Sequence, residues 1–422
     1  MQTTPKGFRL HIGLFGRRNV GKSSLLNALT RQSVSIVSDV AGTTTDPVDK
    51  AMELQPIGPV LFIDTAGIDD AGALGEMRIR RTRQVFDRTD VGIIVTTAGE
   101  WNAFEETVLE ELLNRSVPVI VAFNKSDLGR TDPPLLERLR ALGLPCVPTS
   151  ATSGEGLADL REALTSSVPA DFIKTPPIVG DLIPPGELAV LVVPIDMEAP
   201  KGRLILPQVQ TIRDILDHDA CCLVVKEREL RSALARLREP PALVVTDSQA
   251  FLEVAAATPE SIPLTSFSIL FARVKGDLPE LVRGTLAIDR LQAGDRILVC
   301  ETCTHHPVRD DIGREKIPRW LQHYVNGPLE FAHVQGHDFP EDLSPYSLVV
   351  QCGACMGNRR ETLSRIARCR AAGVPISNYG LTIAFSLGIL PRALGPFPEV
   401  QEVYRRHFAA KFAWENRQHT SR

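Results

Sequence analysis

The segment Gly16-Arg17-Arg18-Asn19-Val20-Gly21-Lys22-Ser23 decides the fold of the first part of this chain. It matches the pattern G-x-x-x-x-G-K-[ST] and stands between the strand-like run RLHIGLF and the helical run KSSLLNAL. Glycines in such a turn let successive N–H groups face phosphate oxygens, while a lysine adds a cation and a serine hydroxyl can bind Mg²⁺. We therefore expect a nucleotide phosphate site formed by Gly16, Asn19, Val20, Gly21, Lys22, Ser23 and Ser24.

A second strand-like run, VLFIDTAG, follows about forty residues later and ends in Asp64 and Gly67. The Asp64 carboxylate can hold Mg²⁺ through water, and the Gly67 N–H can meet a γ-phosphate. Between the two motifs lies the polar stretch GTTTD, where a threonine hydroxyl can join the magnesium shell while the γ-phosphate is present. Thr44 is our first choice for this hydroxyl and Thr43 the second. Lys22, Thr44 and Gly67 are thus the expected catalytic residues.

The base is specified by Asn124-Lys125-Ser126-Asp127, which follows the strand-like run PVIVAF. A carboxylate at Asp127 accepts hydrogen bonds from the N1–H and 2-amino group that guanine has and adenine lacks. A further element, Ser150-Ala151-Thr152, can offer a backbone N–H to the guanine O6 atom. The pattern predicts GTP as the nucleotide.

These five elements, in this order, resemble those of translation-factor-like GTPases over the first 165 residues, and the GTTTD segment and Asn19 resemble the TrmE–Era branch. The resemblance implies a slow, regulatory conversion of GTP and water to GDP and phosphate. The residue after DTAG is Ile68, which cannot orient water by hydrogen bonding. In relatives with an equivalent asparagine a potassium ion lies near the phosphates, so Asn19 is a candidate K⁺ ligand, with local loop capping as the alternative.

The bulk composition is that of a globular, multidomain protein. The chain has 422 residues, 43% hydrophobic and 23% charged, with a net charge of −4. Its length favours two to four domains, and the charge gives no reason to expect a nucleic-acid or membrane partner. The eight dispersed cysteines fit a reducing compartment, and the amino terminus lacks the features of a signal peptide. We expect a cytoplasmic protein.

Alternating strand-like and helical runs predict an α/β fold: a P-loop GTPase domain followed by two smaller α/β domains. A proline-rich stretch separates the first domain from the second, and cysteines follow strand-like runs in the third. The expected boundaries are 1–172 for the GTP-binding domain, 173–186 for a linker, 187–265 for a second domain and 266–422 for a third.

Cysteine pairs of the form C-x-x-C occur at Cys300 with Cys303 and at Cys352 with Cys355. A zinc ribbon would separate its pairs by roughly 15–20 residues, whereas this interval is more than twice as long, so the pattern disfavours a ribbon. Because Cys300 continues the apolar run RILVC, we interpret it as a core cysteine. The other three can converge at the carboxyl edge of a sheet. We interpret Cys146, Cys221, Cys222 and Cys369 as packing residues.

Over its whole length the chain resembles the HydF family of [FeFe]-hydrogenase maturation GTPases, through its GTPase motifs, a middle α/β block and a C-terminal C-x-H…C-x-x-C block. The resemblance implies a [4Fe–4S] cluster on Cys303, Cys352 and Cys355, with His305 as a candidate iron ligand. It also implies a homodimer formed by the middle domain, a transient di-iron precursor as cargo, and radical-SAM maturases and apo-[FeFe]-hydrogenase as partners. Gln351 stands where the family has a second histidine, which puts a fixed histidine ligand there in doubt.

Two alternatives remain open. The TrmE–Era-like first domain is compatible with a GTPase that acts in tRNA or ribosome maturation, although no convincing KH-like GXXG loop or basic stripe accompanies it. The cysteines with His305 are also compatible with a zinc enzyme that keeps water at an open position.

Overall fold

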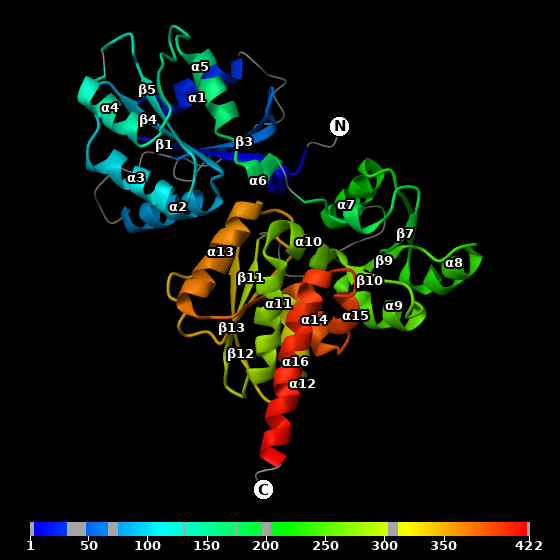
Figure 1. Ribbon diagram of the computed structural model, residues 1–422. Coiled ribbons are helices and arrows are strands. Elements are labelled where there is room, and N and C mark those ends of the chain that lie inside the picture. Colours follow the sequence, from blue (N-terminus) through cyan, green and yellow to red (C-terminus); the bar gives the residue numbers. More distant parts are fainter. Residues whose placement is uncertain are drawn as a thin grey trace. The chain divides into compact units, whose positions relative to one another are not determined.

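The computed structural model describes residues 4–31, 48–65, 75–129, 131–173, 176–195, 202, 204–302 and 311–419. It divides into two compact units, Met1–Thr175 and Pro176–Arg422. Each unit is an α/β structure (Figure 1).

The described strands of the first unit form a six-stranded sheet with the order β2-β3-β1-β4-β5-β6. All neighbours in this sheet are parallel except β2, which runs antiparallel to β3. Helices α1 and α5 bury leucines on one face of the sheet, and α2, α3 and α4 pack on the other. The elements are η1 (Lys6–Phe8), β1 (Leu10–Phe15), α1 (Lys22–Arg31), β2 (Val48–Leu54), β3 (Gly58–Asp64), α2 (Gly75–Arg88), β4 (Val91–Thr97), α3 (Ala103–Asn114), β5 (Val119–Asn124), α4 (Pro133–Ala141), β6 (Cys146–Pro148), α5 (Leu157–Ser166) and α6 (Ala170–Ile173).

Strand β2 was not anticipated from the sequence VDKAMEL, which mixes charged and apolar residues. It lies at the edge of the sheet, where one of its sides has no strand partner among the described elements. Asp49 of β2 accepts hydrogen bonds from both terminal nitrogens of Arg88 in α2, at 3.2 and 3.0 Å. This ion pair joins the edge strand to the helix layer and explains the charge within the strand.

The second unit contains two parallel four-stranded sheets, β10-β9-β7-β8 and β12-β11-β13-β14. The elements of the first half are η2 (Gly180–Leu182), β7 (Leu188–Val192), α7 (Leu206–Asp217), β8 (Cys221–Val225), η3 (Glu227–Glu229), α8 (Leu230–Arg236), β9 (Leu243–Thr246), η4 (Ser248–Ala250), α9 (Phe251–Ala257), β10 (Leu264–Ser266) and α10 (Phe267–Lys275). Those of the second half are α11 (Leu278–Leu286), η5 (Ala287–Arg290), β11 (Arg296–Glu301), η6 (Ile312–Lys316), α12 (Ile317–Val325), β12 (Glu330–Gln335), β13 (Leu348–Gln351), α13 (Arg359–Ala372), β14 (Ile376–Asn378), α14 (Tyr379–Ser386), α15 (Leu390–Ala393) and α16 (Pro398–His419).

Polar side chains fix the starts of the helices that follow these strands. Ser266 caps α10 by accepting a hydrogen bond from the Ile269 N–H, and Asn378 caps α14 in the same way. Asn358 caps α13, which ends at Gly373 in the left-handed conformation that favours glycine. The caps set where each helix begins at the carboxyl edge of its sheet, and this edge is where the cysteines lie. The predicted α/β fold class is confirmed.

Candidate functional site

The turn between β1 and α1 has the backbone of a phosphate-binding loop. Gly16, Asn19 and Gly21 all have positive φ angles, of 155°, 65° and 92°. A side chain on Gly21 would come within 2.3 Å of the Asn124 amide nitrogen, so only glycine fits there. The left-handed Asn19 shows that this residue has a conformational role in the loop, which is compatible with both its capping and its K⁺-ligand interpretation.

Lys22 and Ser23 lie at the first turn of α1. The Lys22 ammonium is buried and donates to the carbonyl oxygens of Gly16 and Arg17, at 2.6 and 3.0 Å. The exposed Ser23 hydroxyl donates to Asp64 Oδ2 at 2.6 Å, which brings the two expected magnesium-binding residues together. The other oxygen, Asp64 Oδ1, is buried without a hydrogen-bond partner among the described residues. This donor set fits Mg²⁺ held through a hydroxyl and an acidic side chain.

Asn124 joins the two loops that would enclose the nucleotide. Its amide nitrogen donates to the Val20 carbonyl at 2.8 Å, and its amide oxygen accepts from the Ala151 N–H at 3.2 Å. Ser150 is fully buried next to this contact, whereas Ser24 and Asp127 are exposed and Lys125 adopts a φ of 59°. The loop after β1 therefore lies next to the loops that carry the expected base-recognition residues.

Arg17 was not expected from sequence to do more than occupy a variable position of the loop. Its Nε donates at 2.8 Å to Oε1 of Glu105, a fully buried residue in the first turn of α3, and its guanidinium also donates to the Glu100 carbonyl. Because Glu105 also forms the capping box of α3 with Asn102, the phosphate loop is tied to the start of that helix. Thr43, Thr44, Gly67 and Ile68 lie outside the described residues, so their roles stay predictions.

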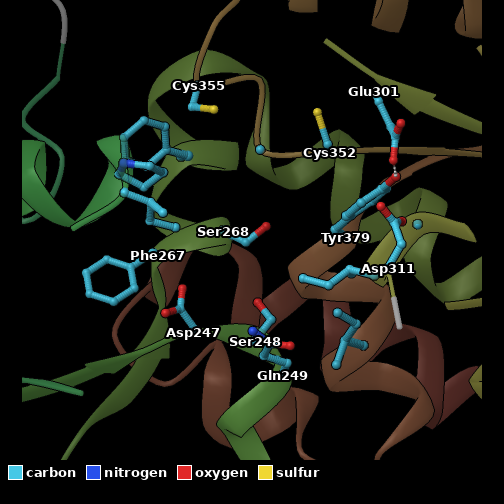
Figure 2. A pocket seen from close by; sticks show the side chains of 17 residues that line it. Asp247, Ser248, Gln249, Phe267, Ser268, Glu301, Asp311, Cys352, Cys355 and Tyr379 are labelled. Carbon is cyan, nitrogen blue, oxygen red and sulfur yellow. Dashed lines mark hydrogen bonds between the residues drawn. The ribbon is translucent and has the colours of Figure 1, made fainter. Parts of the chain in front are cut away.

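In the second unit, Cys352 and Cys355 lie in the loop between β13 and α13, at the carboxyl edge of the C-terminal sheet (Figure 2). The Cys352 sulfur lies 3.2 Å from the Thr302 backbone nitrogen, which donates to it, and 3.3 Å from the Thr302 hydroxyl oxygen. Hydrogen bonds of this kind orient and tune a sulfur that ligates metal. Thr302 follows β11, the neighbour of β13, and only the folded sheet brings it to the cysteine.

Cys303 and His305 lie outside the described residues. Among the residues that are described, no group of three or more His, Cys, Asp or Glu side chains is placed to hold a metal ion. The two placed cysteines, one with a backbone donor and a hydroxyl group at its sulfur, fit two of the three thiolates that the sequence predicts for a metal group.

Cys300 and Gln351 face the other side of the sheet. Cys300 is fully buried in β11, which confirms that it is a core cysteine, and burial raises the pKa of its thiol to about 12. The Gln351 amide donates to the Thr362 hydroxyl of α13 at 3.4 Å. The residue that replaces the family histidine thus packs against a helix, and it is absent from the described lining of the pocket beside Cys352. Cys221, expected to be a packing residue, is exposed on the edge strand β8.

A pocket opens beside Cys352 and Cys355, between the two halves of the second unit (Figure 2). It lies where strands of both sheets end, the usual place for ligands in α/β proteins. Tyr379 donates to Oε1 of the buried Glu301 at 3.4 Å, and Gln335 donates to Oε2 of the same carboxylate at 2.9 Å. Sequence reasoning identified neither Tyr379 nor Glu301, which both line the pocket. The described lining consists of Ile205, Pro207, Asp247, Ser248, Gln249, Phe267, Ser268, Phe271, Glu301, Asp311, Ile312, Gly313, Cys352, Gly353, Cys355, Tyr379 and Ile383.

Comparison with family models identifies all three parts of the chain. The family described as hydrogen maturase F dimerization domain matches residues 178–276, and the one described as hydrogen maturase F tetramerization domain matches residues 279–396. A third model, described as 50S ribosome-binding GTPase, matches residues 11–125. The chain belongs to the hydrogen maturase F family. Its first unit is a GTPase domain, and the pocket beside Cys352 is lined by residues from both hydrogen maturase F domains.

Two curated GTPases are similar to a part of this chain. The tRNA modification GTPase MnmE of Bacillus subtilis is 37% identical over 174 residues, which are 39% of this chain and 37% of that protein. GTPase Der of Wolinella succinogenes is 36% identical over 165 residues, 37% of this chain and 35% of that protein. The chain spans little more than a third of the length of the curated relatives it matches.

Solved structures also match part of the chain. The G domain of the T. maritima FeoB iron transporter is 25% identical, with a TM-score of 0.31, and covers 38% of this chain and 99% of that one. Aquifex aeolicus Era bound to GDP·AlF4⁻ is 22% identical, with a TM-score of 0.32, and covers 51% of this chain and 93% of that one. The fold assignment rests on the strand order and the family model. None of the helices in the described ranges combines the length and apolar character needed to cross a membrane.

Proposed function

We propose that this hydrogen maturase F family member is a GTP-hydrolysing scaffold that binds a [4Fe–4S] cluster and assembles or delivers the di-iron precursor of the hydrogenase active site. The observation that carries the proposal is the pair Cys352 and Cys355 beside a pocket, in a chain that also has a GTPase domain. Cys303 would complete the thiolate set. Radical-SAM maturases would act before the transfer, and apo-[FeFe]-hydrogenase would receive the cargo.

The residues around the pocket support a role in holding cargo. Three thiolates would leave one iron of the cluster with an exchangeable coordination position, for which His305 is the candidate ligand. The pocket combines apolar residues, such as Phe267 and Phe271, with hydrogen-bonding groups such as Tyr379. A small cargo next to the cysteines would therefore meet both an apolar surface and a few directed polar groups.

Self-association is part of the proposal, because the two matching domains are named for dimerization and tetramerization. Strand β8 is at the edge of its sheet, carries the uncharged sequence CCLVV, and exposes Cys221 and Val224. An uncharged apolar edge of this kind is a template for pairing with a second chain. We infer that β8 contributes to the homodimer contact.

The cluster assignment is tested by anaerobic purification and reconstitution, followed by iron and sulfide analysis and iron spectroscopy. Cys303→Ser, Cys352→Ser and Cys355→Ser are each expected to abolish or destabilise the cluster. The matched control is Cys300→Ser, which changes a core thiol on the opposite side of the sheet and is expected to retain iron. Wild-type protein without iron after reconstitution would refute the proposal, and stoichiometric zinc without iron would identify a zinc enzyme instead.

A second function, tRNA or ribosome maturation, is favoured only by the GTPase domain and its similarity to MnmE. It predicts RNA binding that weakens steeply with salt. RNA binding by the full chain, together with no iron uptake, would establish this alternative.

A further inference from the structure

The cysteine loop rests on a buried lysine that the first half of the second unit contributes. Lys275 is the last residue of α10 and is only 2% exposed. Its ammonium donates to the carbonyl oxygen of Gly357 at 3.1 Å, and the Gly357 N–H donates to the Ala354 carbonyl at 3.1 Å. Lys275 therefore holds the turn that contains Cys355. It lies within the match to the dimerization domain, whereas the cysteine loop lies within the match to the tetramerization domain.

Neighbouring contacts make this junction rigid. Arg359, in the first turn of α13, donates to the carbonyl oxygens of Val274 and Gly276 at 2.6 and 2.9 Å. The end of α10 and the start of α13 are thus joined by side chains in both directions. On the same helix, Phe271 lines the pocket beside Cys355. Movement of α10 would displace both the cysteine loop and the pocket.

The charge of Lys275 also affects the cysteine. The buried Lys275 ammonium is held at the Gly357 carbonyl, two residues beyond Cys355, and a cation in this position favours negative charge on that sulfur. A second buried cation, Arg365 of α13, lies near Cys352 and Cys300, but it donates to Glu361 Oε1 at 2.9 Å and is partly neutralised there. Lys275 is the cation that contacts the cysteine turn itself, so it is the one chosen for substitution.

Thiolates that bind iron bring net negative charge into a partly buried loop, and reduction of a bound cluster adds another negative charge. A buried cation near such a cluster lowers the energy of both its oxidised and its reduced state. It lowers the energy of the reduced state more, because that state carries more negative charge. The removal of this cation would make reduction less favourable and weaken iron binding.

We propose that Lys275 is a positioning and charge-compensating residue for the metal group held by Cys355, supplied to the cluster domain by the dimerization domain. This inference rests on the proposed cluster function. It assigns to α10 a role in setting how tightly the group is held and at what potential it is reduced.

The test compares Lys275→Met with Lys275→Gln in the full, anaerobically reconstituted chain. The methionine side chain is about as long as that of lysine but has neither its charge nor its hydrogen-bond donor. The glutamine side chain also lacks the charge but keeps an amide group that can donate a hydrogen bond. The matched control is Arg370→Met, which removes an exposed cation from α13. The measurements are the midpoint potential by spectroscopically monitored redox titration and the rate of iron loss to a chelator.

We expect both lysine variants to shift the midpoint potential to more negative values, while Arg370→Met stays close to wild type. Iron loss should be about tenfold faster in Lys275→Met, as is typical when a group that supports metal ligands is removed. It should be slower in Lys275→Gln than in Lys275→Met. Unchanged melting temperatures would show that the variants are folded.

Two failures can be distinguished. If wild-type protein binds no iron, the proposed cluster function fails before the variants are compared. If wild type binds a cluster and Lys275→Met has the same potential and the same rate of iron loss, only the role of Lys275 is overturned. A lower melting temperature with an unchanged potential would reduce Lys275 to a structural residue.

Discussion

At the residue scale, Cys300 makes the stability of the cluster-free protein depend on pH. Its thiol has a raised pKa of about 12 because it is buried, whereas in the unfolded chain it has the ordinary value of 9.0. The folded state thus keeps the proton over a range in which the unfolded state loses it. The stabilisation is complete below pH 9 and is lost between pH 9 and about 12, by about 1.4 kcal/mol per pH unit.

The measurement is chemical denaturation of cluster-free protein across this range, for wild type and Cys300→Ala. Other groups titrate at the same pH, so the informative quantity is the difference between the two proteins. We expect the wild-type free energy of unfolding to fall more steeply with pH. Parallel curves would contradict the assignment of Cys300 as a neutral core thiol.

Sequence reasoning identified site residues where one continuous motif carries the chemistry, and missed them where the fold brings distant residues together. Ser23 and Asp64 were each predicted from a motif of known purpose, and their side chains meet at 2.6 Å. Lys275 belongs to no motif, and Thr302 is a variable position between Cys300 and Cys303. Each reaches the cysteine loop through a strand or helix that lies beside it only in the folded unit. Such contacts depend on sheet order, which the sequence does not state.

At the element scale, periodicity predicted strands with buried residues on both faces and did not predict the edge strand β2. Strand β1, LHIGLF, is buried along its whole length and is apolar except for His11. The polar residues of β2 are accounted for by its place at the edge and by the Asp49–Arg88 ion pair. The edge strand β8 is a contrary case, because its apolar run resembles a core strand although Val224 is 41% exposed. An apolar edge strand of this kind is a template for pairing with another strand.

This gives a prediction for β8. Val224→Lys places a charge on the exposed edge and should weaken or abolish the homodimer, because lysine at an edge opposes strand pairing. The matched control is Leu252→Lys, which changes a similarly exposed apolar residue on α9. Sedimentation over a range of protein concentrations measures the association. Equal effects of the two variants would indicate that β8 is not the contact, and a dimer that persists in Val224→Lys would also exclude it.

At the scale of the whole molecule, the two compact units carry chemically separate sites. The nucleotide loops lie in Met1–Thr175, and the placed cysteines lie in Pro176–Arg422. Substitution at either site should therefore remove one activity without removing the other. Lys22→Ala is expected to reduce nucleotide affinity and GTP turnover strongly, because the cation that would meet the phosphates is lost, while iron content and iron spectra stay those of wild type. Cys352→Ser is expected to show the reverse pattern.

The comparison of these two variants also bears on why one chain carries both sites. If the GTPase modulates cluster loading or partner exchange, the cluster-free Cys352→Ser protein should still hydrolyse GTP. Wild-type protein should then activate apo-hydrogenase, whereas Lys22→Ala carrying the same amount of iron should not. If wild type and Lys22→Ala activate apo-hydrogenase equally, delivery of the cargo does not depend on GTP turnover. Loss of iron in Lys22→Ala would instead show that nucleotide binding is needed to form the cluster site, and would contradict the independence inferred from the two units.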